Sequence, residues 1–376
     1  MVPEKNKIKN PKSLDSLFLT LILVAVFIGF FIFSSASLGL LARSGASLTS
    51  VTFNQFFLGV IGGIIAMFIT SNIHYRNWRQ YAFYIFIFSS ILTLAVFIPG
   101  LGMSSGGATR WLDLRFTTFQ PSELFKIAFV IYTATLLSGL KQIDTWRYGF
   151  YPFALVLGFS GAIMLTLPDT DNFLVMVVAG FSMFLVAGAR IKHILALGAV
   201  GLAFLSIIVA FRPYLLDRIV TVLNPEDDAL GSGYQIQQSL IAIGTGGLTG
   251  RGYGQSIQKF EYLPEPISDS IFSVFAEEFG FIGSFVLILF FTFFTIRGLK
   301  IATNTKDLFG ALLTVGLITL LITQTFINIA SMSGLFPLSG LALPFISHGG
   351  TALFTTLAAL GIILNVSKYR KNEKVV

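Results

Sequence analysis

Carboxylates gather at one boundary of this chain, where a polar segment gives way to a long apolar stretch. Asp269 immediately precedes that stretch, Glu261 and Glu265 lie just before it, and Glu277 and Glu278 follow two turns later. A carboxylate at such a boundary is partly removed from water, which raises its pKa and makes it a stronger base. Asp269 is therefore a candidate general base, and the alternative for a residue in this position is a helix N-cap.

Basic residues near these carboxylates could hold an anion. Glu123 and Lys126 are three residues apart at the start of another apolar stretch, so they share one helix face. Charges within apolar helices usually face a cavity or one another, so this pair is either structural or part of a site. The alternative for the basic residues in loops is simple solvation. The candidate anion ligands in loops are Arg110, Arg115, Arg218, Arg251 and Lys259.

Metal and nucleotide sites have little support. The chain has no Cys and only three scattered His, which excludes a thiolate site and disfavours a His-based zinc site. The glycines between residues 244 and 254 are not followed by the Lys-Ser/Thr of a phosphate-binding loop, so tight turns explain them. At Pro168, Asp169 and Asp171 the alternative to a functional role is a helix cap. The sequence establishes no cofactor, and a divalent cation, Mg²⁺ or Mn²⁺, stays an open alternative.

The elements that position these residues are membrane-spanning helices. Hydrophobic residues make up 54% of the 376 residues and charged residues 11%, against about 45–50% and about 25% in soluble domains. Lipid must therefore be part of the solvent, and stretches of about 20 apolar residues predict an all-α polytopic protein of about ten spans. The spans are predicted at 17–36, 53–71, 81–99, 122–138, 149–167, 173–188, 192–211, 270–296, 308–331 and 341–365.

The distribution of positive charge predicts the orientation. With the N-terminus inside, 17 of the 25 Lys and Arg residues fall in inside segments, 7 in outside loops, and Lys126 in a span. Cytoplasmic loops carry this excess, so both termini are expected in the cytoplasm, and the net charge of +7 reflects topology rather than nucleic-acid binding. Of the 18 acidic residues 13 lie toward the outside, which favours a site on that face.

The domain organisation follows from these spans. The apolar run Leu17 to Phe33 is too long for a signal peptide and is predicted to be the first span. The chain is expected to form a single transmembrane domain, 1–376, with a large extracytoplasmic loop between spans 7 and 8, and Tyr234 to Ile243 within that loop reads as a short amphipathic helix. Its parts are a membrane core, 16–367, cytoplasmic tails, 1–15 and 368–376, and the extracytoplasmic loop, 212–269.

Three segments carry a specific resemblance. They are GGATRWLDLRFTTFQPSELFK (106–126), GYQIQQSLIAIGTGGLTGRGYGQSIQKFEYLPEPISDSIFSVFAEEFGFIG (233–283) and PLSGLALPFISHGGTALF (337–354). In content and order they strongly resemble the SEDS family of bacterial cell-wall proteins, which includes FtsW, RodA and SpoVE. The resemblance extends from about residue 17 to 367, and the YLPEP and TFQPSE stretches look more like the FtsW branch, which acts in division, than the RodA branch.

The resemblance implies a peptidoglycan glycosyltransferase. The expected substrate is lipid II, a disaccharide-pentapeptide on undecaprenyl pyrophosphate, polymerised into glycan strands with inversion and release of the lipid pyrophosphate. Asp269 matches the position of the family's catalytic carboxylate, and cations would stabilise the leaving pyrophosphate. The other residues expected to bind substrate are Arg110, Lys126, Glu123, Gln120, Ser122, Arg218, Gln235, Gln238, Lys259, Glu261 and Ser347.

Some positions depart from the family's usual pattern. The Pro-Asp-(Phe/Leu)-Gly-Thr turn is here 168–172, Pro-Asp-Thr-Asp-Asn, and the Ser-Tyr-Gly-Gly-Ser motif is here 347–351, Ser-His-Gly-Gly-Thr. Arg115 stands where Gly is common. None of these changes affects Asp269, so they put in doubt only the substrate contacts at these turns.

Alternative functions and partners complete the expectations. A lipid II flippase, or a non-catalytic scaffold for a transpeptidase, would share the lipid-accessible cavity or the partner, but only a polymerase needs a base at the outer surface. The family implies a class B penicillin-binding protein as partner, a division regulatory complex, membrane lipid and no nucleic acid. The expected location is the bacterial plasma membrane, at the division septum.

Overall fold

The computed structural model describes residues 13–42, 51–53, 55–105, 108–113, 118–211, 218, 220–222 and 231–370. Most of the predicted tails, and residues 212–217, 219 and 223–230 of the loop between spans 7 and 8, lie outside this part of the chain. From the N-terminal side, the elements up to residue 139 are α1 (Ser16–Ser37), η1 (Leu38–Ala42), η2 (Gln55–Gly62), α3 (Gly63–Asn72), α4 (Tyr75–Leu94), η3 (Ala95–Phe97), β1 (Gly102–Ser105), β2 (Ala108–Asp113), β3 (Thr118–Phe119) and α5 (Pro121–Gly139). The remainder contains η4 (Trp146–Phe150), α6 (Tyr151–Thr166), α7 (Thr170–Val186), α8 (Ile191–Phe211), α10 (Ser232–Gly246), α11 (Ile271–Thr303), α12 (Leu308–Met332) and α13 (Gly350–Ser367).

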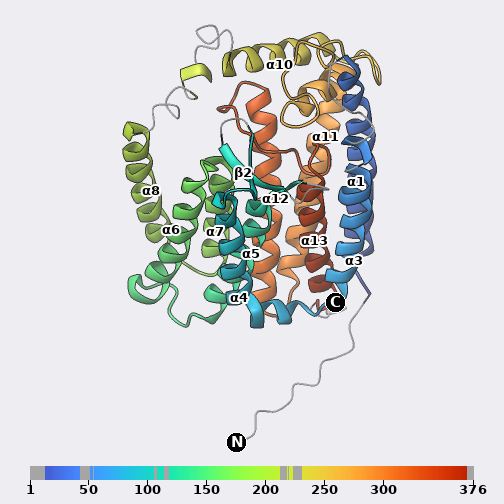
Figure 1. Cartoon of the computed structure of the whole chain (residues 1–376). Coiled ribbons are helices and arrows are strands. Elements are labelled where there is room, and N and C mark those ends of the chain that lie inside the picture. The colour runs from blue at the N-terminus through green and yellow to red at the C-terminus, as the bar shows by residue number, and fades with distance from the viewer. Residues whose placement is uncertain are drawn as a thin grey trace, which may run out of the picture.

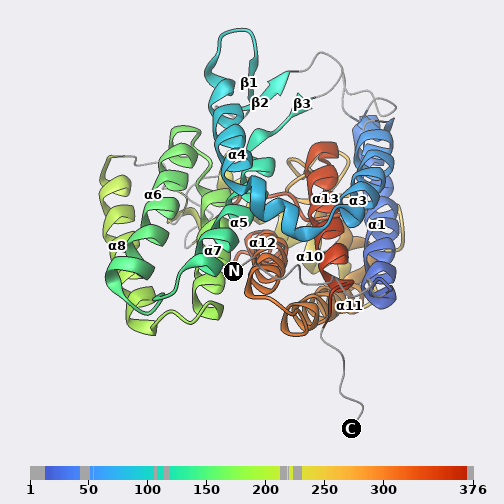
Figure 2. The ribbon, with the colours of Figure 1, turned by 90° about the horizontal axis from the view of Figure 1, so that it is seen from below.

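The predicted polytopic all-α fold is confirmed. Among the described residues, eight helical segments are long and apolar enough to cross a membrane, and two shorter apolar helices, Thr170–Val186 and Ile191–Gly201, lie within or near the other two expected spans. Seen from below (Figure 2), α6, α7 and α8 form one side of the bundle, α1 and α3 the other, and α5 and α12 lie between them. The short antiparallel sheet β1-β2-β3, which the sequence did not predict, projects beside α4.

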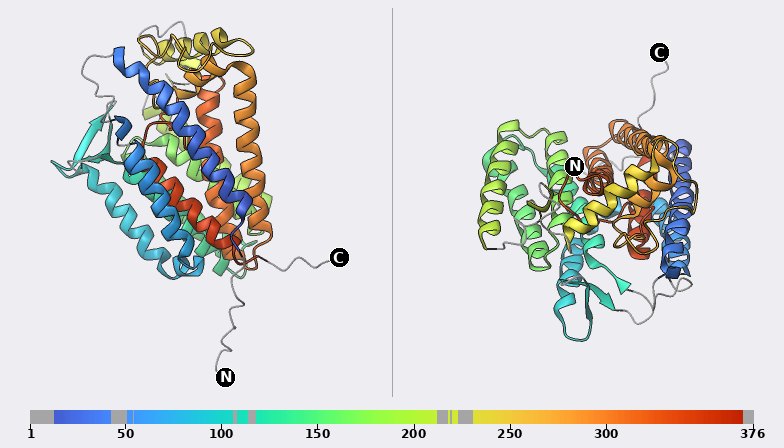
Figure 3. Two further views of the ribbon diagram at one scale, coloured as in Figure 1. Left: turned by 90° about the vertical axis from the view of Figure 1, so that its right-hand side faces the viewer. Right: turned by 90° about the horizontal axis from the view of Figure 1, so that it is seen from above.

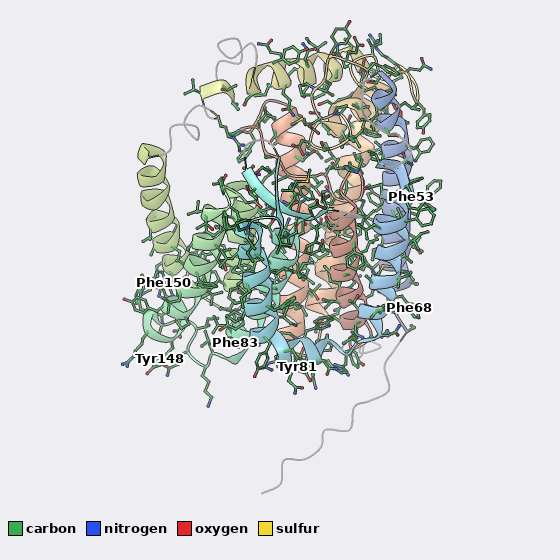
Figure 4. All side chains as sticks on the ribbon, in the orientation of Figure 1. Phe53, Phe68, Tyr81, Phe83, Tyr148 and Phe150 are labelled. Carbon is green, nitrogen blue, oxygen red and sulfur yellow. The ribbon has the colours of Figure 1, made fainter. Side chains whose placement is uncertain are left out.

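Side chains that face outward are largely apolar, as lipid contact requires. Phe53, Phe68, Tyr81, Phe83 and Tyr148 are exposed on the sides of the bundle and on the lower end of α4 and η4 (Figure 4). In water such a surface would be unfavourable, whereas aromatic side chains are common on lipid-facing surfaces and at membrane interfaces. The chain is therefore an integral membrane protein.

The two ends of the helical bundle differ. The start of α1 and the end of α13 meet at the lower end, where the Asp15 amide donates to Ser367 Oγ over 3.1 Å and the Asp15 carboxylate pairs with Arg297 and Arg370. α10 lies across the opposite end (Figures 1 and 3) and confirms the predicted amphipathic helix. The two ends of the described chain are thus on the face opposite α10, as an even number of spans requires.

This arrangement makes the orientation testable, because the chain has no native Cys. Cysteines introduced at Ser232, in the first turn of α10, and at Asn304, after α11, lie at opposite ends of the bundle. In intact cells a membrane-impermeant thiol reagent is expected to label the Ser232→Cys variant and to label Asn304→Cys only after the membrane is opened. The reverse pattern would contradict the assigned orientation.

One predicted span begins later than expected. Residues 341–349 were predicted to start the last span, but α13 begins at Gly350 and the preceding residues are non-helical, with Phe345 at φ 69°. Gln324 and Asn328 of α12 donate to the carbonyls of Ala342 and Leu341, each over 2.8 Å. Irregular backbone is tolerated at membrane depth only where protein satisfies its polar groups, and these partners do so.

The glycine-rich turn has a structural role. α11 breaks at Gly280, where φ is 66°, and the turn after α10 caps both sides of the break. The amides of Arg251 and Gly252 donate to the carbonyls of Glu277 and Glu278, and the amides that follow Gly280 donate back to Gly247 and Leu248. A Cβ at Gly250 would collide with the backbone of Glu278, so close packing requires glycine there.

Candidate active site

Asp269 lies at the outer end of the bundle, directly before α11. Ser270 occupies the N-cap position, and no side-chain cap bond is formed, so the N-cap alternative for Asp269 is not supported. Asp269 is partly buried, and its Oδ2 lies 3.8 Å from the position that a Cβ on Gly340 would occupy. The carboxylate is therefore placed between the start of α11 and the loop that follows α12.

The surroundings of this carboxylate disfavour its charged form. Burial raises the pKa of Asp269 to about 7, and the charges of Glu265 and Asp171 act in the same direction. The positive charges of Arg110 and Arg218 lower the pKa, but their effect is smaller than that of burial. A carboxyl group with this pKa is ionised in a large fraction of molecules at neutral pH and can still take up a proton, as a general base requires.

Arg110 and Arg218 reach this region from separate segments. The Arg110 side chain, on β2, donates from Nε to the Leu167 carbonyl over 3.3 Å and from Nη2 to the Pro168 carbonyl, at the end of α6. Arg218 Nη1 lies 3.3 Å from Asp171 Oδ2, which also accepts from the Gly340 amide over 3.2 Å. Both guanidiniums are thus held by protein groups, and both lie within electrostatic reach of Asp269.

Glu123 and Lys126 form the buried ion pair that their spacing allows. Lys126 Nζ lies 2.8 Å from Glu123 Oε1, 2.7 Å from Asn172 Oδ1 and 3.0 Å from Gln324 Oε1. Asn172 in turn donates to the Asp169 carboxylate over 3.0 Å. This network joins α5, α7 and α12, and a cavity beside it is lined by Glu123, Lys126, Gln324, Pro344, Thr355, Ala359 and apolar residues of α12 and α13.

Lys259, which the sequence places among the expected substrate ligands, is held by protein groups in this structure. Lys259 is fully buried, and its Nζ lies 2.7 Å from Glu278 Oε1 and 3.2 Å from Ser35 Oγ. Glu277 accepts from the backbone amides of residues 257 and 258 and lies 3.6 Å from Arg251. These contacts link the outer loop to α11 and α1, and they engage Glu277 and Glu278, the deeper carboxylates of the boundary, with protein groups. Glu261 is exposed on the same loop.

Other residues of the three motif segments lie either beside Asp269 or near the ion pair of Glu123 and Lys126. Gln235 Nε2 on α10 donates to Ser270 Oγ over 2.9 Å, and Ser347 Oγ donates to the Ser268 carbonyl over 2.6 Å, so both lie beside Asp269. Gln120 occupies the N-cap position of α5, and Ser122 is fully buried near Glu123. Gln238 is partly buried on α10, and Arg115 lies outside the described residues.

Sequence reasoning missed several members of the cluster around Asp269. Asp171 is not among the substrate-binding residues expected from the sequence, where a helix cap is the alternative to a functional role. In the structure Asp169 holds the N-cap position of α7, and Asp171 faces Arg218 and Gly340. The departure of residues 168–172 from the family's usual turn was the one sequence feature that could have drawn attention to Asp171. Asn328 and Gln324 gave none, because a single amide in an apolar helix does not reveal its partner.

The charged groups that the structure describes do not assemble a recognisable metal site. Within the described ranges, no group of three or more His, Asp or Glu side chains is placed to hold a metal ion. The carboxylates near Asp269 are instead interleaved with Arg110 and Arg218. A role for Mg²⁺ or Mn²⁺ remains a prediction, which the metal dependence of activity would test.

Comparison with known proteins places this arrangement in a family. A family model for FtsW, RodA and SpoVE, described as a cell cycle protein, matches residues 15–372. The chain belongs to the FtsW/RodA/SpoVE family. The resemblance of the three motif segments is thereby confirmed, and Asp269 and its partners lie within the matched region.

Individual members of the FtsW/RodA/SpoVE family match most of the chain. Stage V sporulation protein E of Bacillus subtilis is 43% identical over 317 residues, 84% of this chain and 86% of that protein. A probable peptidoglycan glycosyltransferase FtsW of Geobacter metallireducens is 41% identical over 310 residues, 82% of this chain and 83% of that protein. The relatives' names place the family in cell-wall synthesis.

Solved structures share the fold. One chain, from a peptidoglycan synthase complex that coordinates polymerization and crosslinking, matches with a TM-score of 0.78 and 27% identity, over 96% of this chain and 99% of that chain. The rod shape determining protein RodA of Thermus thermophilus matches with a TM-score of 0.69 and 25% identity, over 96% and 98% of the two chains. The polytopic architecture is therefore that of RodA.

Proposed function

We propose that this protein polymerises lipid II into glycan strands, with Asp269 as the general base. The observation that carries the proposal is a partly buried carboxylate with a pKa of about 7 at the outer end of a membrane bundle, flanked by two arginines. A lipid-linked substrate would present its sugar at this end of the bundle. The relatives named as probable peptidoglycan glycosyltransferases support the same reaction class.

The chemistry needs one base and stabilised leaving-group charge. Asp269 takes the proton from a sugar hydroxyl of one substrate while that oxygen attacks the anomeric carbon of the other. The bond from this carbon to the pyrophosphate oxygen breaks, and the lipid pyrophosphate leaves with the electron pair. One displacement inverts the anomeric centre and needs no covalent intermediate, in analogy with inverting glycosidases. Arg110 and Arg218 would offset the negative charge that develops on the pyrophosphate.

Lys126 has a different place in this proposal from the one its sequence position suggested. Its three near partners are protein groups, so direct contact with pyrophosphate would require the exchange of Glu123, Asn172 or Gln324. Gln324 also donates to the Ala342 carbonyl, which links the network to the loop beside Asp269. Lys126 is also buried, whereas Arg110 and Arg218 are partly exposed, so we assign pyrophosphate primarily to these two arginines.

A direct assay distinguishes polymerisation from transport. Purified protein in lipid vesicles is incubated with labelled lipid II, with and without a class B penicillin-binding protein, and the products are separated by glycan length. Polymer made by the parental protein and absent with the Asp269→Asn variant would support the proposal. Transfer of lipid II across the bilayer without polymer would favour a flippase, and neither activity would favour a scaffold.

The cellular setting is part of the same proposal. A solved chain of the same fold comes from a peptidoglycan synthase complex, which supports a class B penicillin-binding protein as partner. Relatives named FtsW support a role at the division septum of the bacterial plasma membrane, with both termini cytoplasmic and a division regulatory complex nearby. Co-purification with the transpeptidase and the position of a fluorescent fusion during division would test these statements.

Arg110→Ala is expected to lower kcat/KM for lipid II about 10- to 100-fold, because a hydrogen bond to a charged group is worth about 1.5–3 kcal/mol. Arg110 also donates to two carbonyls at the end of α6, so a modest loss of thermal stability is expected too. Turnover at limiting lipid II is therefore measured per folded molecule.

The control is Arg190→Ala, which removes an exposed arginine 2.7 Å from Asp144 on a distant loop. This change is expected to leave turnover unaltered. Parental turnover by the Arg110→Ala protein at limiting substrate would remove Arg110 from the site.

A further inference from the structure

The segment that carries Asp269 is fixed by three consecutive backbone carbonyls. The Ile267 carbonyl accepts from the His348 amide over 2.7 Å, the Ser268 carbonyl from Ser347 Oγ over 2.6 Å, and the Asp269 carbonyl from Asn328 Nδ2 over 2.8 Å. This segment precedes α11 and has no regular helix ladder of its own. Its position therefore depends on donors from elsewhere in the chain.

Asn328 is the donor that acts on Asp269 itself. Its side chain lies on α12, is fully buried, and donates from the same Nδ2 to the Leu341 carbonyl, also over 2.8 Å. One amide group thus ties the segment of Asp269 to the loop that follows α12. A flipped amide would set Oδ1 against two carbonyl oxygens, so the hydrogen bonds fix this orientation.

The charges around Asp269 make such an anchor necessary. Glu265 on the same segment and Asp171 at the start of α7 repel the Asp269 carboxylate, and Arg110 and Arg218 attract it from two other elements. His348, in the loop before α13, is a further titratable group near this segment, and it lies within electrostatic reach of Glu265. An unanchored carboxylate would lower its energy by moving toward water, because burial is the largest effect that disfavours its charge.

We propose that Asn328 is a positioning residue for the general base, holding Asp269 at the depth and orientation that proton transfer from the sugar hydroxyl requires. Asn328 acts through the backbone of Asp269 and does not itself contact the reacting atoms. The inference rests on the proposed polymerase function and deepens it. Small displacements of a catalytic group are costly, since a shift of about 1 Å can lower a rate about 100-fold.

The test compares two buried asparagines that each bridge backbone segments. Asn328→Leu removes both hydrogen bonds of Nδ2, to the Asp269 and Leu341 carbonyls, with little change in volume. The matched control is Asn365→Leu at the other end of the bundle, where Asn365 Nδ2 donates to Ser71 and Oδ1 accepts from the Tyr75 amide, both over 2.8 Å. Both variants are purified, their melting temperatures are measured, and lipid II polymerisation is followed as a function of substrate concentration and pH.

For a positioning role, Asn328→Leu is expected to lower kcat about 100-fold with KM little changed, because the base is misplaced while substrate contacts remain. Its kcat/KM profile should also lose activity at a lower pH than the parental profile, since the released carboxylate is better hydrated and ionises more readily. Asn365→Leu is expected to lower the melting temperature and to leave kcat per folded molecule and the pH profile unchanged.

Two other results would count against the inference. If Asn328→Leu loses stability as Asn365→Leu does, with parental kcat and pH profile, Asn328 is structural only. If Asn328→Leu cannot be recovered folded, Asn328→Ser is judged by the same criteria. Failure of the parental protein to make polymer with its transpeptidase present is a separate result, which would overturn the proposed function and this inference together.

Discussion

Replacing Asp269 by asparagine is expected to lower the rate of glycan polymerisation by about 10²–10⁴-fold, the usual contribution of a positioned general base. Asparagine keeps the shape of the side chain but cannot accept the proton of the attacking hydroxyl. Because Asp269 does not cap α11, the change removes no helix-capping bond. The measurement is the initial rate of polymer formation from labelled lipid II at saturating substrate, with the transpeptidase present.

The pH dependence of the parental enzyme provides an independent check. Only ionised Asp269 can act as the base, and its pKa of about 7 means that kcat/KM should fall as the pH is lowered through that value, about tenfold per pH unit below it. The Asp269→Asn variant should show no such limb in its residual activity. Polymerisation by Asp269→Asn at the parental rate would remove Asp269 as the base.

The same variant should fold at least as well as the parental protein. The folded state holds the proton of Asp269 more tightly than the unfolded chain does, so ionisation of this group costs stability as the pH rises from its ordinary pKa toward 7. Asparagine carries no charge and avoids this cost. The melting temperature of Asp269→Asn is therefore expected to exceed the parental value near pH 8 and to approach it in acid.

The second large effect is expected on stability, from breaking the pair of Glu123 and Lys126. Lys126→Met leaves the Glu123 carboxylate buried without its cation 2.8 Å away, at a cost of about 3–5 kcal/mol. The double variant Glu123→Gln, Lys126→Met removes the uncompensated charge and should regain much of this loss. Thermal unfolding in lipid nanodiscs measures the stability, and polymerisation per folded molecule measures any role in turnover.

An exposed ion pair serves as the reference for this comparison. Arg190 and Asp144 lie 2.7 Å apart and are both solvent-accessible, so Arg190→Ala should change stability by no more than about 1 kcal/mol. If Lys126→Met were no more destabilising than Arg190→Ala, the Glu123 pair would not be an important contributor to stability. A double variant that folds well but polymerises poorly would return Lys126 to the substrate site.

The sequence alone was sufficient for the features that depend on single segments. Apolar stretches of about 20 residues marked the spans, because the cost of placing a helix in lipid is largely a sum over its own side chains. The amphipathic α10 and the position of Asp269 before a span were visible for the same reason. The resemblance of the motif segments added the family, which the match over residues 15–372 confirmed.

Tertiary structure decided which polar groups meet. Asp171, Arg110 and Arg218 come from separate segments and converge on Asp269, whereas Lys259, which looked equally available in the sequence, is buried against Glu278. α13 begins only at Gly350, and the non-helical loop before it is accommodated because side chains on α12 donate to its carbonyls. Hydropathy reports the transfer of a segment to lipid, but hydrogen bonds and ion pairs are short-range. Their partners are therefore fixed only when distant segments pack together, as Asn328 and Asp269 do.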